Sequence, residues 1–169
     1  MFSTAILTVS DKGSAGQRED RSSEAIRQVL ARTEASITDY AIVPDEKEVI
    51  SRKLAQWADS LAIDLIITTG GTGFSPRDVT PEATLSVIEK LAPGLAEAMR
   101  AESLKKTPHA MLSRAVAGIR RQCLIINLPG SPKACRECLE VILPALPHAI
   151  EIMKGQATEC AHEGPPPLT

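Results

Sequence analysis

Aromatic residues are nearly absent from this sequence, at 2% of 169 residues, and there is no excess of positive charge. The net charge is -2 at pH 7 and the pI is about 5.9. Nucleic-acid binding needs basic surface, and single-strand platforms need aromatic side chains that stack on bases. We therefore expect no nucleic-acid partner.

No apolar run approaches the roughly 20 residues that cross a bilayer, so we expect no membrane partner. The first three residues also lack the basic start and apolar stretch of a secretory signal, which predicts a cytoplasmic location. Cysteine is scarce, and in that compartment the four thiols would be reduced. Cys135 and Cys138 are spaced as half a zinc site, but no second pair matches. They fall in an apolar helical pattern, so packed thiols are the favoured interpretation over metal or redox use.

Two catalytic signatures are also missing from the sequence. There is no G-x-S-x-G turn, and the glycine-rich stretch at residues 70–73 lacks the Gly-Lys-Ser/Thr ending of a P-loop. This disfavours a serine hydrolase. An enzyme with this composition would work by positioning and charge neutralisation, as in phosphoryl or nucleotidyl transfer.

Apolar β-prone runs alternate with segments of helical periodicity. Strands are expected over residues 4–9, 36–43 and 65–69, and a hairpin over 115–119 and 123–126. Helices are expected from Ser22 and Thr80 as N-caps, after Pro44, and after Ser131, the last of these kinked by two prolines. The helix after Thr80 should extend to residue 91, with another helical piece after 93–94.

This alternation predicts an α/β fold. We expect a single domain with three α/β/α layers and a mostly parallel central sheet, formed by residues 1–154. Residues 155–169, which include a Gly-Pro-Pro-Pro run, are expected to form a flexible tail. No internal repeat or long linker divides the chain.

Four polar loops follow the expected strands, at residues 10–20, 44–45, 70–80 and 127–133. Parallel sheets bind ligands at the carboxyl ends of their strands, so these loops could form one pocket. Glycines at 70, 71 and 73 would let a ligand approach backbone N–H groups next to helix N-termini, which suits phosphate. The simpler alternative is that this stretch is only a turn.

Charged residues in these loops point to a phosphorylated ligand bound with Mg²⁺. Mg²⁺ prefers hard oxygen ligands, and phosphates need cationic donors. The alternative is that the charges form local, solvated ion pairs. The candidate cations are Lys12, Arg77 and Lys133, and the candidate carboxylates are Asp11, Asp45 and Asp78.

The motifs TTGGTG at 68–73 and PRDVTPEAT at 76–84 resemble the signature of the MogA/MoaB-like molybdenum cofactor biosynthesis family, which includes the gephyrin G domain. Further agreement comes from SDKG at 10–13 with DRS at 20–22, VPDE at 43–46 and LPGSPK at 128–133. The likeness extends over residues 4–154. One departure is Ser23, where the family usually has glycine, which could shift the entry into the helix.

The resemblance implies a molybdopterin adenylyltransferase that transfers AMP from Mg-ATP to the terminal phosphate of molybdopterin and releases pyrophosphate. It also implies a homotrimer and hand-over of the product to a molybdenum insertase. The alternatives are a paralogue that binds molybdopterin without adenylylating it, or an assembly protein of the same fold. The implied catalytic residues and Mg²⁺ ligands are Asp45 and Asp78. The implied substrate-binding residues are Ser10, Asp11, Lys12, Gly13, Asp20, Ser22, Gly70, Gly71, Thr72, Gly73, Arg77, Asn127, Pro129, Gly130, Ser131 and Lys133.

Overall fold

Six strands form one sheet in the order β2-β1-β3-β6-β5-β4 in the computed structural model, which describes residues 1–156. Strands β2, β1, β3 and β6 are parallel, whereas β5 and β4 join the edge antiparallel. The mostly parallel sheet and the predicted hairpin, β5 with β6, are therefore confirmed. The strands are β1 (Phe2–Val9), β2 (Ala35–Val43), β3 (Leu65–Thr69), β4 (Lys90–Leu91), β5 (Ala117–Arg120) and β6 (Cys123–Leu128).

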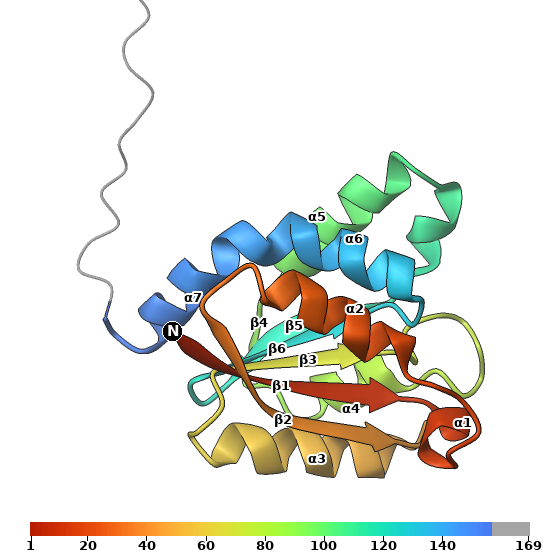
Figure 1. The fold of residues 1–169 in the computed structure, drawn as a ribbon, viewed down its shortest axis with the longest axis horizontal. Coiled ribbons are helices and arrows are strands. Elements are labelled where there is room, and N and C mark those ends of the chain that lie inside the picture. The colour runs from red at the N-terminus through yellow and green to blue at the C-terminus, as the bar shows by residue number, and fades with distance from the viewer. Residues whose placement is uncertain (157–169) are drawn as a thin grey trace, which may run out of the picture.

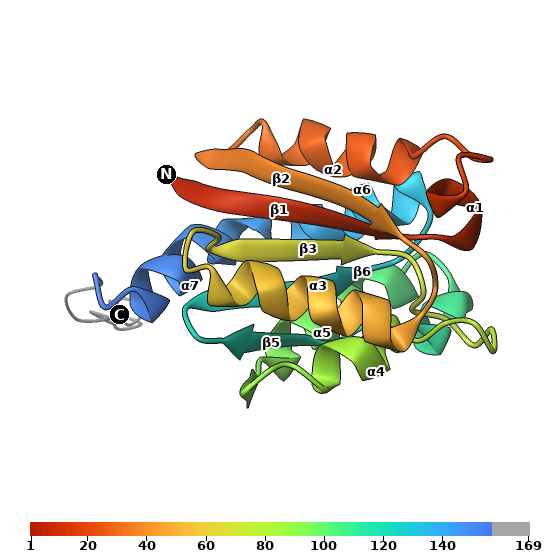
Figure 2. The ribbon, with the colours of Figure 1, turned by 90° about the horizontal axis from the view of Figure 1, so that it is seen from below.

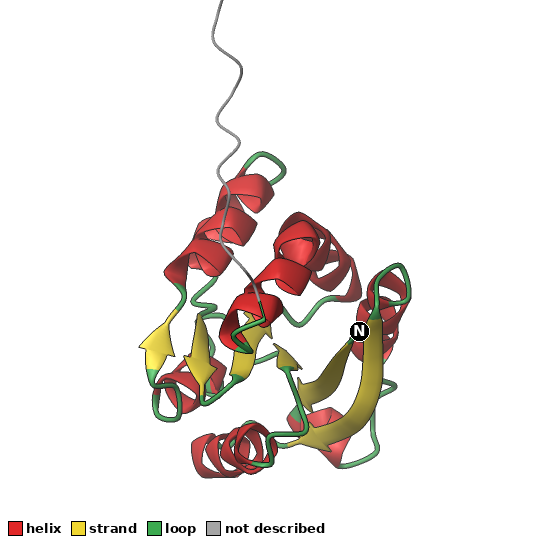
Figure 3. Cartoon of the chain, turned by 90° about the vertical axis from the view of Figure 1, so that its left-hand side faces the viewer, coloured by secondary structure: helices red, strands yellow, loops and turns green. Residues whose placement is uncertain are grey.

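Helices cover both faces of this sheet (Figures 1 and 3). Successive strand side chains point to opposite faces, so Ile6 packs in the core under α2, α5, α6 and α7, while Leu7 packs in the core over α3 and α4. This confirms the three-layer α/β/α architecture. The helices are α1 (Asp11–Ser14), α2 (Arg21–Leu30), α3 (Lys47–Asp59), α4 (Thr80–Leu85), α5 (Pro93–Leu104), α6 (Pro132–Ile142) and α7 (Leu146–Met153), with 3-10 turns η1 (Pro108–Leu112) and η2 (Leu143–Ala145).

The segment after α4 differs from the sequence prediction. The helix ends at Leu85, and Lys90 and Leu91 form strand β4 against β5. Leu85 and Leu91 are exposed, so the apolar spacing that suggested a longer helix does not mark a buried face. Hydrogen bonding to the edge of the sheet outweighs local helical periodicity here. Helix α5 then begins at Pro93 itself, which suits the first turn because proline has no N–H to satisfy.

Both predicted N-caps are wrong by one or two residues. Asp20 caps α2, its carboxylate accepting a hydrogen bond from the N–H of Ser23 at 3.0 Å. Ser23 therefore lies in the first turn of α2 with a negative φ. Serine in place of the family's usual glycine creates no backbone strain there. Val79 occupies the N-cap position of α4, which frees the Thr80 hydroxyl to donate to the carbonyl of Gly70 at 2.8 Å.

The C-terminal helix is divided by its prolines, as expected. Residues 132–153 form α6, the short turn η2 and α7, with Pro144 and Pro147 in the first turns of the latter two. No helix within residues 1–156 is long and apolar enough to cross a membrane. The expected tail falls almost wholly on residues 157–169, outside the described part of the chain, and stays a prediction.

Candidate active site

The parallel strands point the same way and end at one edge of the sheet, beside α1 (Figure 2). A cleft of about 660 Å³, here called the polar cleft, lies at that edge. The loops after β1, β2, β3 and β6 all contribute to it, so the predicted convergence is observed. The sequence-predicted residues that line it are Ser10, Gly13, Asp20, Ser22, Asp45, Gly70, Gly71, Asp78, Gly130 and Ser131.

The predicted cations lie elsewhere. Lys12 and Lys133 are exposed and line neither this cleft nor the one described below, so their contact with substrate stays a prediction. Arg77 is engaged by Asp11 through two hydrogen bonds, of 3.0 and 2.8 Å. Asp11 and Arg77 do not line either cleft.

Asn127 lines neither cleft, so its contact with substrate also stays a prediction. Its side chain is fully buried, and the amide nitrogen donates to the hydroxyls of Thr68 at 3.0 Å and Thr84 at 2.9 Å. Its carbonyl oxygen accepts from the N–H of Val116 at 3.3 Å. Asn127 thus joins β6 to β3, to α4 and to the segment before β5.

Sequence reasoning missed the cations that do line the polar cleft, Arg18 and Arg21. Arg21 pairs with Glu19 at 3.1 Å, whereas no ion pair or hydrogen bond of the Arg18 side chain occurs within residues 1–156. Arg18 lies in the polar loop at 10–20, for which the sequence gave no role to this residue, and Arg21 is the first residue of α2. Their contribution depends on how the segment after α1 folds over the end of β1, which no local pattern reveals.

Asp45 and Asp78 bring two carboxylates to the polar cleft. Burial raises the pKa of Asp45; a hydrogen bond from the Asp11 N–H opposes the rise, and the negative charges of Asp11 and Asp78 add to it. Asp78 is held by its neighbour, since its Oδ2 accepts from the N–H of Ser75 at 3.1 Å. The cleft therefore concentrates negative charge that a bound cation would compensate.

This donor set fits Mg²⁺. The ion is bound through oxygen and commonly takes one or two protein carboxylates together with substrate phosphates. Within residues 1–156 no group of three or more His, Cys, Asp or Glu side chains is arranged to hold a metal. Two carboxylates open to the cleft match the type of site in which substrate phosphates complete the coordination shell of the ion.

Gly71 allows the glycine loop, residues 70–73, to pack against the carboxylate of Asp45. Its φ is +66°, and a Cβ there would overlap the hydroxyl oxygen of Thr80 and lie 3.3 Å from Oδ1 of Asp45. Only glycine adopts this backbone conformation without strain and leaves room for both neighbours.

Helix N-termini supply positive potential to the same cleft. Asp20 and Arg21 at the start of α2, and Ser131 and Pro132 at the start of α6, all line it. The hydroxyl of Ser22 donates to the carbonyl of Gly130 at 2.7 Å and holds the two helix starts together. Partial positive charge and unpaired N–H groups at such ends bind phosphate.

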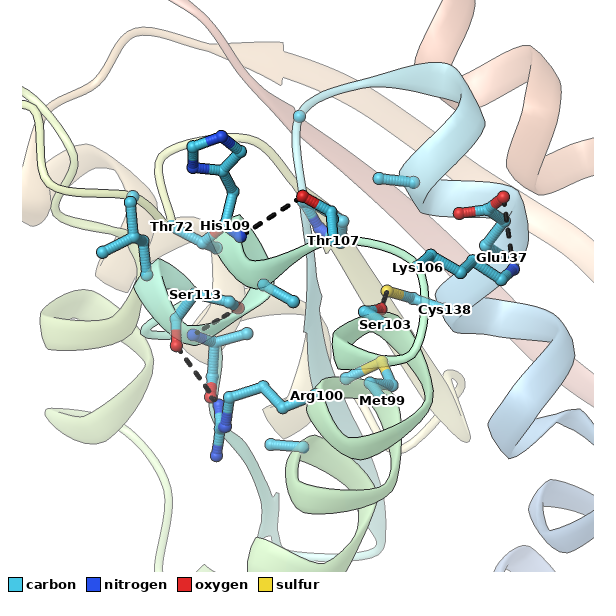
Figure 4. Close-up of a pocket in the computed structure, with 18 of the residues that line it drawn as sticks. Thr72, Met99, Arg100, Ser103, Lys106, Thr107, His109, Ser113, Glu137 and Cys138 are labelled. Atoms are coloured by element: carbon cyan, nitrogen blue, oxygen red, sulfur yellow. Dashed lines mark hydrogen bonds and ion pairs between the residues drawn. The ribbon is translucent and has the colours of Figure 1, made fainter.

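A second cleft of about 460 Å³, here called the apolar cleft, lies between α5, η1, α6 and the glycine loop (Figure 4). Its walls are mainly apolar, with Met99 among them, and Arg100, Lys106 and His109 add basic groups. The predicted residues Thr72, Gly73 and Pro129 line it. Gly71, Asp78 and Gly130 border both clefts, so the two clefts meet beside Asp78.

Arg114 fixes the loop that carries Asp78. Its guanidinium donates to the carbonyls of Gly73 and Asp78, both at 2.7 Å, and pairs with the carboxylate of Glu82. The arginine thereby joins the glycine loop to the start of α4. This residue was not among the predicted site residues, because it reaches the loop from more than 30 positions away.

The two cysteines of the Cys135–Cys138 pair are placed differently, since Cys138 lines the apolar cleft and Cys135 packs against Thr69. Cys135 is buried, and its thiol donates to the carbonyl of Pro129 at 2.8 Å and lies 3.1 Å from the Thr69 hydroxyl. Burial raises the pKa of Cys135 to about 11, so the group is a neutral thiol at pH 7.

Residues 5–148 match the family model described as a probable molybdopterin binding domain. The chain belongs to this molybdopterin-binding family. A molybdopterin adenylyltransferase of Helicobacter pylori strain J99 is 47% identical over 152 residues, which cover 89% of this chain and 86% of that protein. Gephyrin of Dictyostelium discoideum is 48% identical over 161 residues, 89% of this chain but 22% of gephyrin.

The fold of this family member agrees with solved structures. The molybdopterin biosynthesis enzyme MoaB of Thermus thermophilus superposes with a TM-score of 0.88 at 53% identity, and the match covers 94% of this chain and 100% of that one. The resemblance found in the sequence motifs is thus confirmed by comparison of whole chains and of folds.

Proposed function

We propose that the protein is a molybdopterin adenylyltransferase, which transfers AMP from Mg-ATP to the terminal phosphate of molybdopterin and releases pyrophosphate. The observation that carries this proposal is the meeting of Asp45 and Asp78 with two helix N-termini in one cleft. The names of relatives that share 47% of their residues with this chain support it.

The chemistry requires little from a protein base. The terminal phosphate of molybdopterin is a monoester whose second pKa is about 6, so it is largely a dianion at pH 7. One of its oxygens attacks the α-phosphorus of ATP, a new P–O bond forms, and the bond to the bridging oxygen of the β-phosphate breaks. Pyrophosphate takes the electron pair and leaves.

The barrier comes from bringing two polyanions together. In this chain the N-termini of α2 and α6 and the guanidinium groups of Arg18 and Arg21 face the polar cleft and offset the negative charge of the phosphates. Asp45 and Asp78 would hold Mg²⁺. When bound, that ion neutralises phosphate charge that the carboxylates alone would repel. Gly71 and Gly130 border both clefts and have no side chains, so they would leave room for phosphates between the clefts.

The two clefts divide the substrates by chemistry. The polar cleft suits phosphates because of its cations and helix ends, and the apolar cleft suits a flat ring system because of its apolar walls. Asp78 borders both, which is where a phosphate joined to a ring system would meet the other substrate.

Release of pyrophosphate from ATP in the presence of molybdopterin and Mg²⁺ tests the proposal. We expect wild-type turnover, and a loss of about 10²–10³ in kcat for Asp78→Asn, which keeps the side-chain shape but removes the charge. Arg32→Gln, two residues beyond the C-terminal end of α2, serves as the control. Full adenylylation by Asp78→Asn with unchanged Mg²⁺ dependence would remove Asp78 from the reaction. Tight pterin binding by the wild type without pyrophosphate release would favour the non-adenylylating paralogue.

We also propose that the protein acts in the cytoplasm as a homotrimer and passes its product to a molybdenum insertase. Motif resemblance supports the homotrimer and the hand-over. Light scattering after gel filtration tests the trimer, and pull-down with a purified insertase, with and without the adenylylated product, tests the hand-over.

A further inference from the structure

Asp11 and Arg77 form a forked ion pair beside the polar cleft. Nε of Arg77 donates to Oδ2 of Asp11 at 3.0 Å, and Nη2 donates to Oδ1 at 2.8 Å. This two-point geometry fixes the relative orientation of both side chains. The pair joins the loop after β1 to the loop after β3. With side chains 56% and 46% exposed, it adds little to overall stability.

Asp11 is in turn locked to Asp45 by two reciprocal hydrogen bonds. The N–H of Asp11 donates to Oδ2 of Asp45 at 2.8 Å, and the N–H of Asp45 donates to Oδ1 of Asp11 at 3.0 Å. Oδ1 of Asp45 receives no hydrogen bond from residues 1–156, and it lies on the side of Gly71. The lock therefore uses one carboxylate oxygen of Asp45 and leaves the other toward the cleft.

We propose that Asp11 and Arg77 are positioning residues for Asp45 and not substrate ligands. Arg77 orients the carboxylate of Asp11, and Asp11 orients the backbone and carboxylate of Asp45, so that Oδ1 stays free of hydrogen bonds at the polar cleft. This inference rests on the proposed adenylyl transfer. The positive charge of Arg77 offsets the negative charge of Asp11. The Asp11 carboxylate can therefore hold Asp45 without placing an uncompensated negative charge beside it.

Double-mutant cycles through Asp45 separate positioning from direct binding. We expect Asp11→Ala and Arg77→Ala each to lower kcat for pyrophosphate release about 10- to 100-fold, the usual cost of losing a group that orients a ligand. KM for ATP should stay within about twofold, because no substrate contact is removed. In an Asp45→Asn background, neither substitution should lower kcat further, since their effect passes through Asp45.

Two further variants sharpen the result. Asp11→Asn keeps an oxygen acceptor for the N–H of Asp45 and should lose less activity than Asp11→Ala. Arg32→Ala removes a surface pair of similar exposure, a single contact of Nη1 with Glu140 at 2.7 Å between side chains that are 64% and 42% exposed, and should leave kcat unchanged. If Arg77→Ala instead raises KM for ATP, and its loss adds to that of Asp45→Asn, Arg77 binds phosphate directly and the proposal is wrong.

A measurement without turnover keeps this test independent of the proposed function. The amide proton of Asp45, which donates to the Asp11 carboxylate, should move upfield in ¹⁵N–¹H spectra of Asp11→Ala and Arg77→Ala but not of Arg32→Ala. If the wild type releases no pyrophosphate, adenylyl transfer fails while the amide shifts still report on positioning. An Asp45 amide shift unchanged in both variants would overturn the positioning role.

Discussion

Gly71→Ala should be the most informative single-atom addition to the site. The residue has φ of +66°, a conformation that costs an L-residue about 1–2 kcal/mol. Its new Cβ would overlap the hydroxyl oxygen of Thr80, which donates to the carbonyl of Gly70 in a fully buried hydrogen bond of 2.8 Å. Displacing that hydroxyl costs about 1–3 kcal/mol more, because the carbonyl is left without its partner. We therefore expect a total destabilisation of about 2–5 kcal/mol.

Gly16→Ala provides the matched control. Gly16 has a similar φ of +71°, but no atom lies within 4 Å of the position that its Cβ would take. It should lose only the backbone contribution of about 1–2 kcal/mol. Urea unfolding followed by the fluorescence of Trp57, the single tryptophan of the chain and a buried residue of α3, measures both variants.

The comparison can refute the packing argument. If Gly71→Ala unfolds within about 0.5 kcal/mol of Gly16→Ala, the clash with Thr80 is relieved at no cost and the reasoning is wrong. Pyrophosphate release, measured where both variants are folded, should fall further for Gly71→Ala. The reason is that its Cβ would lie 3.3 Å from Oδ1 of Asp45, a carboxylate that lines the polar cleft.

Three other predictions concern charged groups. Arg114→Gln should lower stability by roughly 2 kcal/mol and reduce kcat, since two loop carbonyls lose a charged donor; urea unfolding and turnover measure this. Arg18→Ala should raise KM for Mg-ATP about 10-fold with little change in unfolding, and equal KM would exclude a phosphate contact. Burial works to raise the pKa of Asp64, but hydrogen bonds from Lys154 and Ser3 outweigh it and hold the pKa below its usual range. Its stabilisation is present above pH about 4 and lost as pH falls through the folded pKa, so Asp64→Asn should unfold more easily than wild type at pH 7, and the difference should shrink as the pH falls below about 4.

Local patterns in the sequence predicted most of the fold. Short apolar, β-prone runs located β1, β2, β3 and the β5–β6 hairpin. Strands β1, β3 and β6 are buried on both faces, which favours apolar residues at nearly every position. The failures occurred where partners distant in sequence decide the outcome. Strand β4 exists because β5 offers it an edge, and Ser22 does not cap α2 because its hydroxyl reaches Gly130 from another loop.

The candidate site was likewise predictable only where its residues follow a local pattern. Strand ends followed by glycine, carboxylates and helix starts identified the polar cleft, including Asp45 and Asp78, because all parallel strands end at one edge. The apolar cleft was missed, because α5, η1 and α6 form it from residues that are ordinary in their own segments. The sequence also left open whether the loop charges bind phosphate or pair with one another, and the fold pairs Arg77 with Asp11.

The sequence by itself therefore determined the α/β alternation, the loops that carry the chemistry and the family, since each is written in short-range patterns and motifs. Tertiary structure alone decided which charged side chains line the two clefts. An ion pair between residues 11 and 77, or a guanidinium from residue 114 on the glycine loop, depends on distances across the folded sheet. Such contacts have no periodicity along the chain, so only the folded arrangement separates the residues that could bind phosphate from those that hold a carboxylate in place.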